Sequence, residues 1–92
     1  MIEAKRIFSG QKRRYGDYIR EWEIMTDCTK EVVLEWIFNN LGIKRVPEYK
    51  EWQKNFRNED GSTNYSYYFA GYYIIKPMDG GFLFTVYEPY AD

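Results

Sequence analysis

The aromatic residues in the last third of the chain constrain its fold more than any other feature of the sequence. Residues 65–90 contain ten of them, namely Tyr65, Tyr67, Tyr68, Phe69, Tyr72, Tyr73, Phe82, Phe84, Tyr87 and Tyr90. Aromatic residues favour β-strands, and the Asp79-Gly80 step between the two aromatic runs is a strong signal for a tight hairpin turn. We therefore predict two strands, over residues 65–75 and 82–90, that pair as a hairpin.

The length of this turn predicts which aromatic side chains face the core. A turn of two residues, or of any even number, segregates the two faces of the hairpin cleanly. One face then carries Phe69, Gly71, Tyr73, Ile75, Phe82, Phe84 and Val86, and we expect it to be the core. The opposite face carries Tyr68, Tyr72, Leu83, Thr85 and Tyr87, and is amphipathic rather than plainly polar.

The first half of the chain changes from a strand period to a helix period. Alternation over residues 2–8 and 18–25 predicts two strands joined by a polar, basic loop that begins at Ser9-Gly10. In the first strand the alternation places Ile2, Ala4, Arg6 and Phe8 on one side. Trp22 and Ile24 share one side of the second strand. From residue 30 the spacing becomes helical, with the apolar residues Val33, Trp36, Ile37 and Leu41 on one face. Asp27 or Thr29 is the expected N-cap, and Gly42 follows the expected last turn.

Pro47 suits the first turn of a second, shorter helix, which would place Tyr49, Trp52, Gln53 and Phe56 on one side. Residues 57–64 are polar and are predicted to form an exposed loop. The order of elements indicates a single α+β domain over residues 1–92. We predict a four-stranded, mainly antiparallel sheet of two hairpins. The long and the short helix are inserted between the hairpins and pack on the face that carries Trp22, Ile24, Tyr73, Phe82 and Phe84.

The composition argues against several kinds of chemistry. The chain has one cysteine, Cys28, and no histidine, so an internal disulfide and a Cys/His zinc site are excluded and the thiol has no imidazole base. No apolar stretch approaches the roughly 18 residues that span a bilayer, and the N-terminus does not read as a signal peptide. We expect a non-enzymatic cytoplasmic protein without metal, cofactor or membrane contact.

The net charge of −1 conceals an asymmetry. Residues 1–20 hold six basic and two acidic side chains, a balance of +4, and residues 21–92 hold seven and twelve, a balance of −5. Basic and aromatic residues near the first loop suggest a nucleic-acid or acidic-partner contact, and these are Lys12, Arg13, Arg14, Tyr15 and Arg20. The alternative is a solvated loop, and the acidic remainder of the chain would repel a polyanion.

The tyrosine-rich face is the favoured functional surface. Tyrosine combines an apolar ring with a polar tip, which suits a surface that is stable in water and still binds a partner tightly. A protein partner, a second copy of the chain, or internal burial under the second helix would each account for such a face. The size and composition are similar to those of inhibitor and anti-defence proteins of phages and mobile elements, including anti-CRISPR proteins. We expect a protein-interaction module, with a nucleic-acid-binding accessory protein as the alternative.

Overall fold

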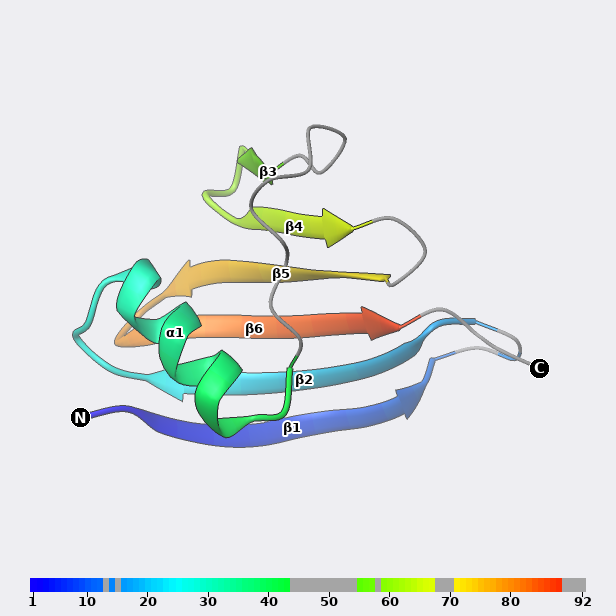
Figure 1. Ribbon diagram of the computed structural model, residues 1–92, viewed down its shortest axis with the longest axis horizontal. Coiled ribbons are helices and arrows are strands. Elements are labelled where there is room, and N and C mark those ends of the chain that lie inside the picture. The colour runs from blue at the N-terminus through cyan, green and yellow to red at the C-terminus, as the bar shows by residue number, and fades with distance from the viewer. Residues whose placement is uncertain (13, 15, 44–54, 58, 68–70, 89–92) are drawn as a thin grey trace.

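The computed structural model describes residues 1–12, 14, 16–43, 55–57, 59–67 and 71–88, and its strands form one antiparallel sheet (Figure 1). The elements are β1 (Glu3–Gln11), β2 (Tyr18–Met25), α1 (Lys30–Asn40), β3 (Asn55–Arg57), β4 (Thr63–Tyr67), β5 (Gly71–Met78) and β6 (Gly81–Glu88). The strand order is β1-β2-β6-β5-β4-β3, so the N-terminal and C-terminal hairpins join through β2 and β6. Figure 1 shows α1 lying across one face of this sheet.

The predicted α+β class is confirmed, and the four predicted strands correspond to β1, β2, β6 and β5. The sheet continues beyond them with β4 and β3. Residues 65–75 do not form one strand, because β4 ends at Tyr67 and β5 begins at Gly71. The expected loop over residues 57–64 includes the end of β3 and the start of β4.

The predicted second helix falls mostly outside the described residues. Residues 44–54 are among those left undescribed, and Phe56, which we had placed on this helix, lies in β3 instead. β3 pairs with β4 over three residues, with Phe56 opposite Asn64.

Local signals determine the bounds of α1. The Thr29 side chain accepts a hydrogen bond from the Val32 amide at 3.4 Å, which makes Thr29 the N-cap. Leu41 is the C-cap, and its amide donates to the Ile37 carbonyl at 2.9 Å. Gly42 then adopts a left-handed backbone with φ of +70°, which glycine tolerates without steric cost. The predicted helix and its two ends are therefore confirmed.

The core lies between α1 and the sheet face that α1 covers, which we call the inner face. Its buried members are Trp22, Ile24, Val33, Leu34, Ile37, Ile43, Tyr73, Ile75, Phe84 and Val86. The Phe84 ring lies 6.1 Å from the Trp22 ring and 5.5 Å from the Tyr73 ring, measured between centroids. The buried face of α1 differs from the predicted one, because Leu34 is buried with Val33 and Ile37 whereas Trp36 and Leu41 are only half-buried against this cluster.

The register of the C-terminal hairpin matches the prediction. Met78 pairs with Gly81, so Asp79-Gly80 is a two-residue turn, and Gly80 has a φ of +80°. Tyr73 and Ile75 therefore share the inner face with Phe84 and lie directly opposite Val86 and Phe84.

One strand departs from the predicted facing. β1 continues through Ser9 and Gly10 to Gln11, beyond the point where we placed the start of the loop. Its register shifts between Arg6 and Phe8, with Arg6 opposite Trp22 and Phe8 opposite Glu21. The extra residue at this β-bulge, Ile7, moves Phe8 from the inner to the opposite face, which simple alternation does not anticipate.

Candidate functional site

The sheet face opposite α1, which we call the outer face, consists of cross-strand rows of side chains. In the central strands these rows are Ile19, Tyr87 and Tyr72, then Glu21, Thr85 and Ile74, and then Glu23, Leu83 and Lys76. Residues that lie directly opposite one another on neighbouring antiparallel strands project to the same side and contact each other. The outer face is therefore aromatic at one end, mixed in the middle and charged at the other end.

Tyr72 and Tyr87 form a stacked pair at the aromatic end. They are directly opposite in the β5–β6 register, with ring centroids 4.5 Å apart and ring planes 12° from parallel. Both side chains are half-buried. Because each ring restricts the other, the pair presents an aromatic surface with little side-chain freedom left to lose on binding.

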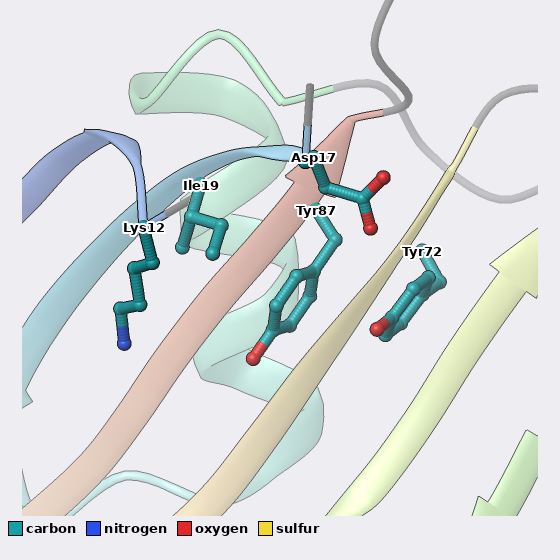
Figure 2. Close-up of a pocket in the computed structure, with 6 residues that line it drawn as sticks. Lys12, Asp17, Ile19, Tyr72 and Tyr87 are labelled. Carbon is teal, nitrogen blue, oxygen red and sulfur yellow. The ribbon is translucent and has the colours of Figure 1, made fainter. Parts of the chain in front are cut away.

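The stacked pair borders a pocket of about 290 Å³ that is also lined by Lys12, Gly16, Asp17 and Ile19 (Figure 2). Ile19 is a buried residue of β2, with 8% of its surface exposed. The loop between β1 and β2 supplies the other three residues. A 2.8 Å hydrogen bond from the Gln11 side-chain nitrogen to the Gly16 carbonyl holds this loop against the end of β1. The pocket thus joins the first loop to the C-terminal hairpin, which are distant in sequence.

Burial and negative charge both act on the two phenols. Burial raises the pKa of Tyr72 above its usual value, and the Asp17 carboxylate raises this pKa further. The pKa of Tyr87 is raised first by burial, then by Tyr72, Glu21 and Asp17. Both tyrosines therefore remain protonated at neutral pH and keep hydroxyl groups that donate hydrogen bonds.

The structure places three of the five predicted outer-face residues as expected. Tyr72, Leu83 and Tyr87 are half-buried on the outer face. Thr85 lies on the same face but is only 5% exposed, and its hydroxyl donates a 2.7 Å hydrogen bond to a Glu21 carboxylate oxygen. Thr85 is thus buried within the face rather than presented to solvent. Tyr68 lies outside the described residues.

The structure separates Lys12 and Arg20, two described members of the basic set, onto opposite faces of the sheet. The Lys12 ammonium lies 5.1 Å from the centroid of the Phe8 ring on the outer face. Arg20 belongs to the inner side of β2, where its guanidinium lies 5.8 Å from the Trp22 ring and 2.6 Å from a Glu88 carboxylate oxygen. Arg14 is exposed in the first loop, and Arg13 and Tyr15 lie outside the described residues.

Sequence reasoning missed Asp17, Gly16 and Ile19 as members of the site. Ile19 carried a usable signal, because it is an apolar residue on the side of β2 that otherwise holds Glu21 and Glu23. Asp17 carried no specific sequence signal, since an aspartate next to a glycine is common in loops.

Comparisons of the chain with models of protein families, with curated proteins and with solved structures gave no significant match. Over the described residues, no helix has both the length and the apolar character needed to cross a membrane. The same part of the chain holds no group of three or more histidine, cysteine, aspartate or glutamate side chains arranged to hold a metal ion.

Proposed function

We propose that this chain is a small non-enzymatic interaction module that binds a protein partner through the aromatic end of its outer face. The contact surface consists of the Tyr72 and Tyr87 pair, the pocket beside it, and Leu83 farther along the same face. Lys12 of the first loop forms the rim. The proposed setting is the cytoplasm, in keeping with the lone cysteine.

The observation that carries this proposal is a stacked, partly exposed aromatic pair on the face away from the helix. Within the described residues, α1 packs on the inner face, where Trp22 and Phe84 are buried. The outer face still leaves Tyr72 and Tyr87 partly exposed beside a pocket. Tyrosines in such positions are typical centres of binding energy in interfaces, because they bury large areas at small entropic cost.

Two other occupants of this face are tested alongside the proposal. A second copy of the chain would bury the face in a symmetric dimer. A nucleic acid would stack bases on the tyrosines and pair phosphates with Lys12 and other basic residues of the first loop. Within the class of protein-binding modules, we propose an inhibitor of the kind that phages and mobile elements direct against host defence, with support from size and charge profile.

The test compares a double variant with a matched control. The double variant, Tyr72→Thr with Tyr87→Thr, removes both rings and replaces them with threonine, which is compatible with a β-strand. The control, Tyr18→Thr, makes the same change at an exposed tyrosine on the inner side of β2. Each protein is used to capture partners from an extract of the source organism. The captured protein is identified, purified and titrated against all three forms. Circular dichroism and a melting curve verify that each variant is folded.

We expect the double variant to lose more than a hundredfold in affinity, since interface tyrosines contribute about 2 kcal/mol or more each, whereas Tyr18→Thr keeps the affinity of the parent. Equal affinity in a folded double variant would overturn the proposal. Sedimentation analysis that shows a tight dimer disrupted by the double change would assign the face to self-association. A steep salt dependence of binding to a short DNA or RNA would favour the nucleic-acid alternative.

A further inference from the structure

We infer that the pocket beside the stacked tyrosines takes a cationic side chain of the partner, and specifically an arginine. This inference rests on the proposed function and adds the chemistry of the group that the surface recognises. It is drawn from the charge, the ring geometry and the size of the pocket.

A carboxylate, that of Asp17, lies beside the aromatic pair and lines the same pocket. Figure 2 shows this carboxylate beside the side chains of Tyr87 and Tyr72, and all three residues line the pocket. Asp17 is exposed, and therefore accessible to a partner. The Asp17 carboxylate also raises the pKa of both phenols, and the Glu21 carboxylate raises the pKa of Tyr87, which is the effect of nearby negative charge. The aromatic end of the outer face therefore favours a positive group.

Lys12 is the cation that lines the same pocket, and its position does not cancel this preference. Its ammonium lies over the Phe8 ring, 5.1 Å from the centroid. In Figure 2 its side chain extends away from Asp17, with Tyr87 between them. A partner anion placed against Tyr72 and Tyr87 would meet the Asp17 carboxylate, whereas a cation there would pair with it.

The ring geometry favours a guanidinium over an ammonium. The rings of Tyr72 and Tyr87 lie 4.5 Å apart and 12° from parallel, so each ring covers one face of the other, and a planar group can stack on the ring face that remains uncovered. Guanidinium groups stack on aromatic faces and also bind carboxylates through two parallel N–H donors, which an ammonium cannot do. The pocket volume of about 290 Å³ lies just below the roughly 300 to 1,000 Å³ of small-molecule sites, which suits one side chain.

The test uses two blocked tripeptides as probes. Acetyl-Gly-Arg-Gly-amide carries the guanidinium, and acetyl-Gly-citrulline-Gly-amide replaces it with a neutral urea of nearly the same shape. Each is titrated at constant ionic strength into isotopically labelled protein, and backbone amide shifts are followed by NMR. The protein forms are the parent chain, Asp17→Asn, and the matched control Asp79→Asn, which makes the same charge change in the β5–β6 turn at the other end of the hairpin.

We expect the arginine peptide to shift the amides of Asp17, Tyr72 and Tyr87 and to bind about tenfold more tightly than the citrulline peptide, from the combined cation–π and ion-pair contributions. Asp17→Asn should weaken it about threefold, and Asp79→Asn should not change it. Equal binding of the two peptides, an unchanged affinity in Asp17→Asn, or a shift pattern elsewhere in the chain would overturn the inference. A hexathymidylate that saturates this pocket would also overturn it.

This experiment separates the two proposals. If the peptides fail while the double tyrosine variant still loses its partner, the outer face remains a binding surface and only its cation preference is wrong. If the double tyrosine variant keeps its partner, the proposed function is wrong whatever the peptides do.

Discussion

Breaking the hydrogen bond between Thr85 and Glu21 tests whether the middle of the outer face contributes to folding stability. Thr85 is 5% exposed, and its hydroxyl donates to the Glu21 carboxylate at 2.7 Å across β6 and β2. Thr85→Val removes the donor at nearly constant shape. The change in unfolding free energy of this variant alone contains two contributions, the loss of the hydrogen bond and the gain from burying another methyl group. A double-mutant cycle with Glu21→Ala is needed to separate them.

The expected coupling free energy follows from the burial of the two partners. Hydrogen bonds to charged groups contribute about 1.5 to 3 kcal/mol. Glu21 is only half-buried and regains water when Thr85 is replaced, so we expect a coupling at or just below the lower limit of this range, about 1 to 1.5 kcal/mol. Urea unfolding of the parent, both single variants and the double variant at pH 7 measures this coupling.

A parallel cycle supplies the control. Glu23 is also half-buried on the outer face, but it lies opposite Leu83 rather than Thr85. Coupling between Glu23→Ala and Thr85→Val should therefore be close to zero. A Glu21 coupling within about 0.3 kcal/mol of zero would show that the hydrogen bond contributes nothing to stability, and Thr85 would again be a candidate contact residue.

Three further predictions address the core, the sheet and the phenols. Trp22→Ala should cost about 3 to 5 kcal/mol in unfolding free energy, because Trp22 is buried against Phe84, and a cost below about 1 kcal/mol would contradict this packing. Gly81→Ala should lower the melting temperature, because the added methyl group would overlap the Ile24 carbonyl oxygen in β2, and an unchanged melting temperature would contradict the β2–β6 register. At high pH the unfolded tyrosines ionise near their ordinary value of about 10 while the raised pKa values of Tyr72 and Tyr87 keep them protonated in the folded state. The extra stability is thus fully present below pH 10 and is lost as the pH rises through the folded values. A spectroscopic titration in which all tyrosines ionise together near 10 would refute the predicted shifts.

Local signals in the sequence identified α1, the four strands β1, β2, β5 and β6, and one important register. The cap at Thr29, the left-handed Gly42 and the spacing of Val33 and Ile37 bound α1 without reference to the rest of the fold. The Asp79-Gly80 turn placed Tyr72 and Tyr87 on one face, because a two-residue turn fixes the pairing of every residue that follows it. These inferences succeeded because each depends on residues within a few positions of one another.

Only the tertiary structure decided how distant segments meet. The pairing of β2 with β6 places Ile19 beside Tyr87 and Glu21 beside Thr85, and folding of the first loop adds Asp17 to the pocket. The bulge in β1 reverses the facing of Phe8, which alternation alone misassigned. Such features depend on which strand lies next to which, and that choice is made by burial summed over the whole sheet rather than by the propensity of any short segment.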